Sequence, residues 1–224
     1  DPYLQNLLNK VTRRKVTYGF KPQNRYQILE YAPHSDHSLC RIRVGDKTET
    51  LKLRVAGKHN ALNSLAALAV GEELSIPREK TLEALEKFQG VQRRLQRRGE
   101  LKGITLVDDY AHHPTEIAAT LSALRERYPQ SKIRAVFQPH RYSRVEDLFH
   151  EFSSCFWDCD AIAVTPIYAA SEKPIPGIDG AALAESITKK GHQRAQFMSS
   201  PLEAVQHWLS ESSAGDIVVT LGAG

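Results

Sequence analysis

The sequence of 224 residues predicts an α/β protein whose larger part is a Rossmann-like, mostly parallel sheet with helices on both faces. From residue 104 onward, short apolar segments alternate with segments whose apolar residues recur at helical spacing. The first of these strands, at residues 104–107, ends in a polar cluster and leads directly into a helix. A composition of 41% hydrophobic and 25% charged residues is ordinary for a soluble domain.

Composition and charge narrow the class of protein. The formal net charge is +4, and no apolar run approaches the roughly 20 residues that span a bilayer. No signal-peptide pattern opens the chain at Asp1. Three cysteines are too few, and odd in number, for a disulfide framework, which fits a reducing compartment. We expect a cytoplasmic protein in which Cys155 and Cys159, one helical turn apart, are core residues.

The first 90 or so residues are predicted to form one unit. Segments rich in β-formers at residues 26–31, 39–44 and 50–55, with Gly45-Asp46 as a turn, predict a small antiparallel meander. Two helices are predicted after it, the second of which ends at Gly90. Their apolar stripes are Leu62, Leu65, Ala66 and Ala69, and then Leu82, Leu85 and Phe88.

The rest of the chain alternates between strands and helices. Strands are predicted at residues 104–107, 133–137, 161–165, near 197 and at 217–220. Helices are predicted at residues 117–128, 145–156, around 183–187 and through 202–209. This alternation is typical of a parallel sheet covered by helices. A doubly wound fold would add a helix after Gly224, so we expect a truncated chain.

The strand at residues 104–107 ends where open α/β sheets place their ligands. The segment Asp108 to Glu116 contains neighbouring carboxylates, a phenol and two imidazoles at a helix start. Pro114 suits the first helical position, and Glu116 suits the positive end of the helix dipole. These groups predict a ligand site that handles protons, and ordinary helix capping is the alternative.

A second strand end repeats this pattern. Residues 138–144 contain His140, Arg141 and Arg144 directly after the strand at 133–137. Two such corners of one sheet can face each other. We therefore predict that Arg141 or Arg144, with His112 and His140, binds a zwitterion such as an amino acid, because a guanidinium pairs well with a carboxylate. Solvent-facing arginines at a helix start are the alternative.

Weaker signals lie outside these corners. Asn60 and Asn63 share one helix face. Both amides could contact the edge of a purine, or Asn60 could be the N-cap of the helix and Asn63 a solvated residue. The densest positive cluster, Arg93 to Arg98, favours a nucleotide phosphate or an acidic small substrate. It lacks the interleaved aromatic residues that favour nucleic acid. No Cys or His pair has zinc-finger spacing, so no metal site is predicted.

Five strings of residues resemble the Mur ligases. They are His59-Asn60-Ala61-Leu62-Asn63, Arg93-Arg94, Asp108 to Glu116, Phe137 to Arg144 and Tyr168 to Glu172. The two longest strings resemble the alanine-adding branch, and the similarity runs from near residue 10 to the final Gly-Ala-Gly. Members of the family have a domain for a UDP-sugar, a central ATP-binding domain and a C-terminal domain for the incoming amino acid.

The resemblance implies a division of this chain into two domains. Residues 1–94 would be the C-terminal part of the central ATP-binding domain, and residues 95–224 the Rossmann-like amino-acid-binding domain. The sequence contains no UDP-sugar domain, no Gly-Lys-Thr phosphate loop and none of the family's Glu and His magnesium ligands. We therefore expect ATP and Mg²⁺ to need residues mostly outside this chain, which should be inactive alone.

The implied activity is the ATP-dependent ligation of L-alanine to the carboxylate of UDP-N-acetylmuramate through an acyl phosphate, in peptidoglycan precursor synthesis. Its partners would be these small molecules and the remainder of the same chain, without nucleic acid or membrane. His59, Asn60 and Asn63 would lie on the adenine side of ATP. Arg94 would lie near the phosphates in a hinge between Gly90 and Gly99, and Asp109 would hold the ribose or order that hinge.

The same resemblance assigns the amino-acid site. The residues that would surround L-alanine are Tyr110, His112, His140, Arg141 and Arg144. Arg144 is expected to bind the carboxylate through two parallel charge-assisted hydrogen bonds. Either His112 or His140 would take a proton from the ammonium group, because imidazoles titrate near neutral pH.

Two other functions stay open at this point. A sibling ligase that attaches a recycled tripeptide to the same UDP-sugar shares the architecture, but it needs a larger amino-acid site, and the Phe137 to Arg144 string favours alanine. A non-catalytic module that binds nucleotides, anions or nucleic acid through Arg93 to Arg98 is the alternative from another class. Salt-sensitive binding of an oligonucleotide without binding of an amino acid would favour the module.

Overall fold

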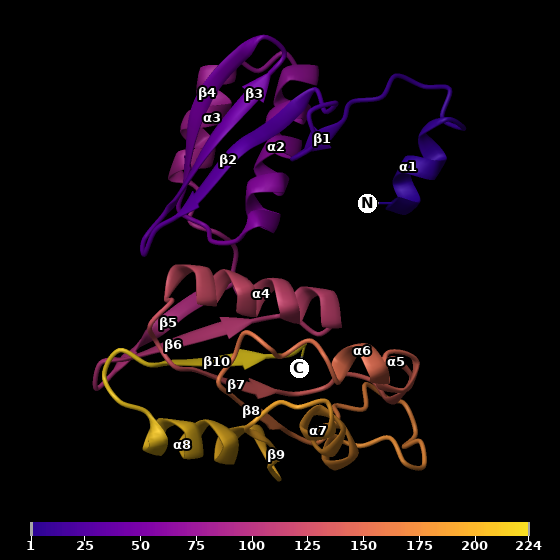
Figure 1. The fold of residues 1–224 in the computed structure, drawn as a ribbon, viewed down its shortest axis with the longest axis vertical. Helices are drawn as coiled ribbons and strands as arrows, with labels where there is room; N and C mark the ends of the chain where they lie inside the picture. The colour runs from indigo at the N-terminus through magenta and orange to yellow at the C-terminus, as the bar shows by residue number, and fades with distance from the viewer. Residues whose placement is uncertain (1, 224) are drawn as a thin grey trace. The chain divides into compact units, whose positions relative to one another are not determined.

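A computed structural model describes residues 2–223, which form two compact units (Figure 1). The first unit comprises the chain up to Ala32, His37–Arg54 and Lys58–Phe88. The second comprises Pro33–Asp36, Val55–Gly57 and the chain from Gln89 onward. The expectations about the start of the chain at Asp1 and its break at Gly224 fall outside the described residues.

The first unit is a four-stranded sheet with helices. The strand order is β1-β2-β3-β4, with β3 and β4 antiparallel around the predicted turn at Gly45. The three predicted strands and two predicted helices are confirmed, whereas α1 and β1 were not predicted, and β1 pairs parallel to β2. The bounds are α1 Pro2–Leu8, β1 Tyr18–Gly19, β2 Tyr26–Pro33, β3 Ser38–Val44, β4 Lys47–Leu53, α2 Lys58–Glu73 and α3 Arg78–Lys87.

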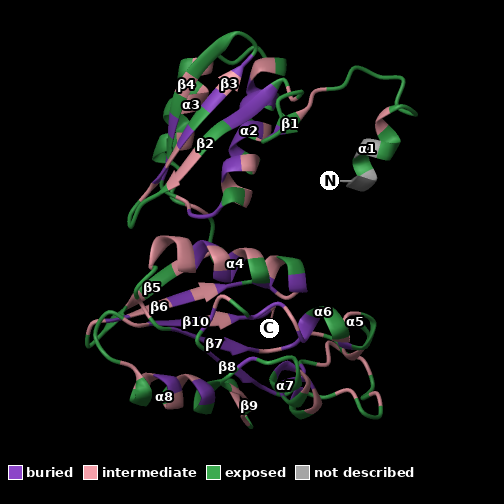
Figure 2. Ribbon diagram, in the orientation of Figure 1, coloured by how far each residue is buried: buried purple, intermediate pink, exposed green. Residues whose placement is uncertain are grey.

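Alternation along the strands builds the core of this unit. In β3, Cys40, Ile42 and Val44 are buried, while Arg41 between them is exposed. Successive strand residues point to opposite faces, so one face of the sheet is apolar. Leu65 of α2 is fully buried, and α2 shows the same division into buried and exposed faces in Figure 2.

The second unit is a six-stranded sheet in the order β5-β6-β10-β7-β8-β9. The edge strand β5 is antiparallel to β6, and all other neighbours are parallel, which confirms the predicted fold class. Because β10 lies between β6 and β7, the two strands with predicted site corners are not neighbours. The bounds are β5 Gln96–Leu101, β6 Ile104–Asp109, α4 Pro114–Arg127, β7 Ile133–Phe137, α5 Tyr142–Asp147, α6 Phe149–Phe152, β8 Ala161–Val164, α7 Gly180–Lys189, β9 Ala195–Phe197, α8 Pro201–Glu211 and β10 Ile217–Leu221.

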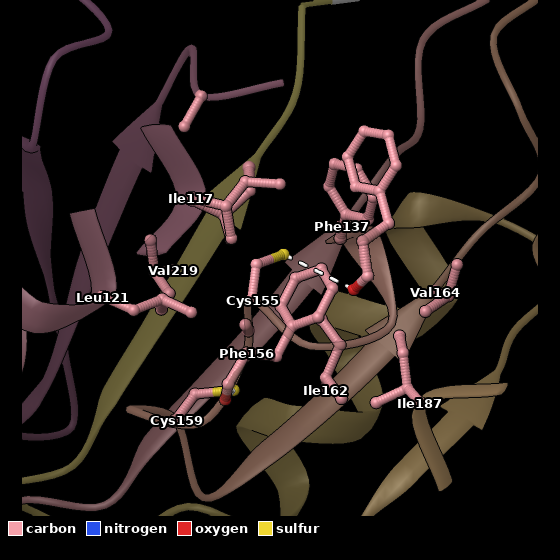
Figure 3. Close-up of a cluster of buried hydrophobic side chains, with 14 of the residues drawn as sticks. Ile117, Leu121, Phe137, Cys155, Phe156, Cys159, Ile162, Val164, Ile187 and Val219 are labelled. Carbon is pink, nitrogen blue, oxygen red and sulfur yellow. Dashed lines mark hydrogen bonds between the residues drawn. The ribbon is translucent and has the colours of Figure 1, made fainter. Parts of the chain in front are cut away.

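Helices cover both faces of this sheet. The larger core joins α4, α6 and α7 to one face, and Figure 3 shows Ile117 of α4, Ile187 of α7 and Phe137 of β7 within it. Trp208 of α8 packs on the opposite face and donates a hydrogen bond to the Ala135 carbonyl, 2.9 Å away. Strands β7 and β8 are buried along their whole length (Figure 2), which makes the sheet a rigid base for the loops at its edge.

Two local predictions in this unit are wrong. The helix predicted at residues 145–156 is two short helices, because Leu148 leaves the helical region with φ −119° and ψ 22°. Cys155 and Cys159 follow α6, so they are not on one helical turn, although both are buried core residues as predicted. Burial raises the pKa of both thiols. Strand β5 was not predicted.

Within the described residues, no helix combines the length and apolar character needed to cross a membrane.

Candidate functional site

The corner between β6 and α4 fixes the orientation of His112. Pro114 occupies the first turn of α4, and the ring of the N-cap residue His113 accepts a hydrogen bond from the Thr115 amide. The His112 Nδ1 atom lies 2.9 Å from the Tyr110 carbonyl oxygen. A carbonyl only accepts hydrogen bonds, so this contact requires a proton on Nδ1, and in the neutral ring the lone pair then lies on Nε2. The same Nδ1 atom lies 3.5 Å from Glu116 Oε2.

The corner after β7 brings His140 and Arg144 together. Nη1 of Arg144 lies 3.2 Å from His140 Nδ1 and 3.2 Å from the His140 carbonyl oxygen. A guanidinium only donates, so His140 accepts at Nδ1 and is neutral with its proton on Nε2. Burial, with help from Arg144, lowers the pKa of His140 below its ordinary value. The two imidazoles therefore have opposite tautomers.

The two corners meet beyond the end of β10. The ring centroids of His112 and His140 are 6.1 Å apart, at an interplanar angle of 67°. Between the corners, the chain after β10 is Gly222, whose amide donates to the Asp109 carbonyl at 3.2 Å. Its φ is +153°, and a Cβ atom there would lie 3.0 Å from the Gln138 carbonyl oxygen. Glycine thus lets the two corners approach each other.

Aromatic rings extend this site on both sides. Tyr110 lies edge-on to His112 with a centroid distance of 5.1 Å. Tyr168, in the loop after β8, stacks on His140 at 5.4 Å and 14°. Three loops, after β6, β7 and β8, therefore contribute one continuous row of four rings at the carboxyl edge of the sheet.

Arg93 and Arg94 lie beside the same row. Their Cζ atoms are 5.0 Å and 5.7 Å from the Tyr110 ring centroid. Arg93 also donates to the Gly222 carbonyl at 2.7 Å, and Arg94 lies 3.9 Å from Glu116. The positive cluster predicted at Arg93 to Arg98 is divided by this geometry, because Arg97 and Arg98 belong to strand β5.

Asp109 holds the segment that precedes β5. It is only 3% exposed, and its two oxygens accept from the amides of Leu95 at 2.6 Å and Ala111 at 2.7 Å. Burial raises the pKa of this carboxyl, although the two amides and Arg94 oppose the shift. Leu95 has φ +45°, so the carboxylate fixes a left-handed residue within the predicted hinge.

The remaining predicted site residues belong to two different units: three are in the first unit, and Arg141 is in the second. His59, Asn60 and Asn63 are in α2 of the first unit, where the Asn63 amide donates to the Asn60 side-chain oxygen at 3.4 Å. Because α2 begins at Lys58, Asn60 is inside the helix and is not its N-cap. Arg141 is exposed and has φ +70°.

Two residues of the site were not singled out from the sequence. Tyr168 forms the stack described above, and Glu172 accepts from the Ser143 amide at 3.0 Å and the Ser143 hydroxyl at 2.7 Å. These hydrogen bonds hold the pKa of Glu172 below its ordinary value. The only available signal was the resemblance of the Tyr168 to Glu172 string, because an exposed loop has no periodic pattern.

Among residues 2–223, no three His, Cys, Asp or Glu side chains are grouped so that they could hold a metal ion.

Comparison with known families covers most of the chain. The family described as "Mur ligase, glutamate ligase domain" matches residues 93–224, and the "Mur ligase middle domain" matches residues 1–71.

Curated relatives match along the whole chain. A UDP-N-acetylmuramate–L-alanine ligase of Desulfosudis oleivorans is 44% identical over 99% of this chain and 49% of its own length. One of Caulobacter vibrioides is 43% identical over 100% of this chain and 49% of its own length. The chain thus spans about half the length of the curated relatives it matches.

Solved structures show the same fold. The UDP-N-acetylmuramate–alanine ligase MurC of Thermotoga maritima has a TM-score of 0.77 and 30% identity, over 94% of this chain and 45% of that one. The MurF ligase of Thermotoga maritima in complex with ADP has a TM-score of 0.75 and 21% identity, over 99% of this chain and 48% of that one. The second likeness concerns the fold alone.

Proposed function

This chain belongs to the Mur ligase family, and we propose that it is the amino-acid-binding half of an ATP-dependent ligase that joins L-alanine to the carboxylate of UDP-N-acetylmuramate. The observation that carries this proposal is the meeting of His112, His140 and Arg144 at the carboxyl edge of one sheet. The curated relatives at 43–44% identity bear that activity in their names. Such a ligase, which consumes ATP and a nucleotide-linked sugar, would work in the cytoplasm.

Arg144 would bind the carboxylate of L-alanine. Both hydrogen bonds that its guanidinium makes to described residues use Nη1, so no acceptor among these residues binds the edge formed by Nε and Nη2. That edge matches the two oxygens of a carboxylate. His140 holds the guanidinium in place, and because it is neutral it adds no charge repulsion.

His112 would receive the ammonium proton. Its Nδ1–H is held by the Tyr110 carbonyl, so in the neutral ring Nε2 carries the lone pair that would accept the proton. The free amine then attacks the carbonyl carbon of the acyl phosphate, the bond from that carbon to the phosphate oxygen breaks, and inorganic phosphate leaves. The second proton passes from nitrogen to the departing phosphate as the amide forms. His140 is unsuited to this role, because protonation of Nδ1 would break its bond to Arg144.

The earlier step forms the acyl phosphate. The muramate carboxylate attacks the γ-phosphorus of ATP, and ADP leaves. We propose that residues 1–94 belong to the ATP-binding domain, with His59, Asn60 and Asn63 toward the adenine and Arg94 toward the phosphates. The described residues offer no metal cluster, so the Mg²⁺ expected for this chemistry would depend on residues elsewhere in the protein.

Asp109 is proposed to order the hinge and not to hold the ribose. Both of its oxygens are already bound to backbone amides in a buried position. A ribose hydroxyl would have to reach a carboxylate that is only 3% exposed, which disfavours that contact.

The test is a substrate comparison with the longer protein that contains this chain. Phosphate release would be measured with ATP, Mg²⁺ and UDP-N-acetylmuramate, while L-alanine, the recycled tripeptide or no amino acid is added. Release that depends on L-alanine, with formation of the amide product, is expected. Release that depends on the tripeptide alone would assign the chain to the sibling ligase, and no release would leave only a binding module.

A further inference from the structure

The loop after β8 is tied to the corner after β7 by five contacts. The Tyr168 amide donates to the Pro139 carbonyl at 2.8 Å, and the Arg141 amide donates to the Tyr168 carbonyl at 2.8 Å. The Tyr168 ring stacks on His140, and the Glu172 carboxylate binds the amide and hydroxyl of Ser143. We call residues 168–172 the clamp loop. It holds both the residue before and the residue after His140.

The clamp loop has a strained conformation that these contacts maintain. Ala170 has φ +47° and Ser171 has φ +70°, in a region that disfavours residues with a Cβ atom. Arg141, on the other side of the contact, has φ +70° as well. Such strain costs on the order of 1–3 kcal/mol per residue, and it persists where surrounding contacts fix the geometry.

Core packing does not account for the Tyr168 ring. The residue is 49% exposed, so its burial contributes little to folding. Its ring contact is with His140, whose other ring neighbour is His112. An aromatic stack at this position restricts the plane of the imidazole, and it closes one of the two ring faces to a ligand.

The Glu172 carboxylate acts on Arg144 through the start of α5. Ser143 directly precedes Arg144, and both of its hydrogen-bond donors, the amide and the hydroxyl, donate to Glu172. Arg144 in turn binds His140 through Nη1. Rotation of this first turn of α5 would move the guanidinium edge away from the histidine pair.

We propose that Tyr168 and Glu172 are positioning residues of the amino-acid site: Tyr168 fixes the ring of His140, and Glu172 fixes the helix turn that carries Arg144. This inference rests on the proposed function, because it deepens the description of the same site. Neither residue needs to touch the substrate, so each acts through the geometry of another side chain.

The positioning itself is tested in the 224-residue chain. The NMR signal of the His140 ring would be compared in Tyr168→Leu, which removes the ring, and Tyr168→Phe, which keeps it. We expect nuclear Overhauser contacts between the two rings in the wild type and in Tyr168→Phe. We expect Tyr168→Leu and Glu172→Gln to shift the His140 ring resonances, while Glu146→Gln, an exposed acid on α5, leaves them unchanged.

The consequence for the reaction is tested in the longer protein. Tyr168→Leu and Glu172→Gln should each raise the KM for L-alanine by roughly tenfold to a hundredfold, the scale of a small misplacement, with the KM for ATP unchanged. Tyr168→Phe should restore most of the affinity. Ser143→Ala removes one donor to Glu172, so its effect and that of Glu172→Gln should be less than additive in the double variant.

The outcomes separate this inference from the proposed function. An L-alanine KM within twofold of the wild-type value in both Tyr168→Leu and Glu172→Gln would overturn it. If Tyr168→Leu fails to fold, Ser143→Ala and Glu172→Gln are compared instead. An L-alanine KM within twofold of the wild-type value in both of these variants would then overturn the inference. If the wild type does not use L-alanine, the proposed function fails, and unchanged His140 resonances in Tyr168→Leu or Glu172→Gln would still refute the positioning.

Discussion

At the scale of residues, the two histidines of the site differ in their hydrogen-bond partners. His112 is bound through Nδ1 to a carbonyl, and His140 is bound through Nδ1 to a guanidinium. These partners impose opposite tautomers on two imidazoles whose centroids are 6.1 Å apart. In the proposed reaction, the same side chain type would therefore have two different roles, as a proton acceptor and as an anchor for Arg144.

The charge state of His140 gives a testable pH dependence. Burial lowers its pKa, Arg144, His112 and Arg141 lower it further, and Glu172 opposes them. Because the folded pKa lies below the unfolded value, His140 stabilises the fold above the unfolded value of about 6.5, and this contribution is lost as pH falls through the folded pKa. Histidine NMR titration should give a pKa below that value in the wild type.

A variant of Arg144 tests whether this arginine helps to lower the pKa of His140. Arg144→Met removes both the positive charge and the donor to Nδ1, so the pKa of His140 should move up toward its ordinary value. Arg98→Met removes a charge from β5, an edge strand three positions from β7 in the sheet, and should leave the His140 titration curve unchanged. A His140 titration curve that is the same in all three proteins would contradict the assignment.

At the scale of elements, Asp109 joins the end of β6 to the segment before β5. Its oxygens accept from Leu95 and Ala111, which lie on opposite sides of it along the chain. One buried carboxylate therefore holds both the approach to the edge strand and the turn into α4. A carboxylate suits this position because both of its oxygens accept and neither donates.

Asp109→Asn should consequently destabilise the second unit. An amide side chain offers one acceptor, so its NH₂ group would face a backbone N–H and leave it unpaired. We expect the free energy of unfolding to fall by about 1–3 kcal/mol in urea denaturation. Asp147→Asn, at an exposed position of α5, is the matched control, and an equal stability of both variants would count against this role for Asp109.

The N-cap of α5 provides a second prediction at this scale. Arg141 occupies that position with φ +70° and ψ 131°, which glycine adopts more easily than any residue with a Cβ atom. Arg141→Gly should therefore be more stable to urea than Arg141→Ala by about 1 kcal/mol. An Arg141→Ala variant at least as stable as Arg141→Gly would show that the backbone is not strained here.

A helix or strand can be predicted from the sequence only where its apolar residues form a recognisable pattern. Strands β7 and β8 are buried on both faces, and both are easy to recognise because they are apolar apart from Arg134 of β7. Strand β5 contains Gln96, two arginines and Glu100, and as a polar edge strand it has no such pattern. The break at Leu148 has neither glycine nor proline to signal it, which explains the single helix that was predicted.

At the scale of the whole molecule, the order of strands builds the site. The two corners were predicted from local strings, but the insertion of β10 between β6 and β7 is a long-range pairing that no local pattern reveals. Gly222 after β10 lets the corners meet in spite of that insertion. The contact between the loop after β8 and the site also depends on the sheet order, so the position of Tyr168 beside His140 could not be predicted from a local pattern.

The affinity for L-alanine in an Arg144 variant tests the central claim most directly. The KM for L-alanine and the KM for ATP would be measured in the longer protein for the wild type, Arg144→Met and Arg98→Met. Loss of charge-assisted hydrogen bonds should raise the KM for L-alanine by roughly tenfold to a hundredfold in Arg144→Met alone, with the KM for ATP unchanged. An L-alanine KM in Arg144→Met equal to that of the wild type would contradict an amino-acid site built on His112, His140 and Arg144.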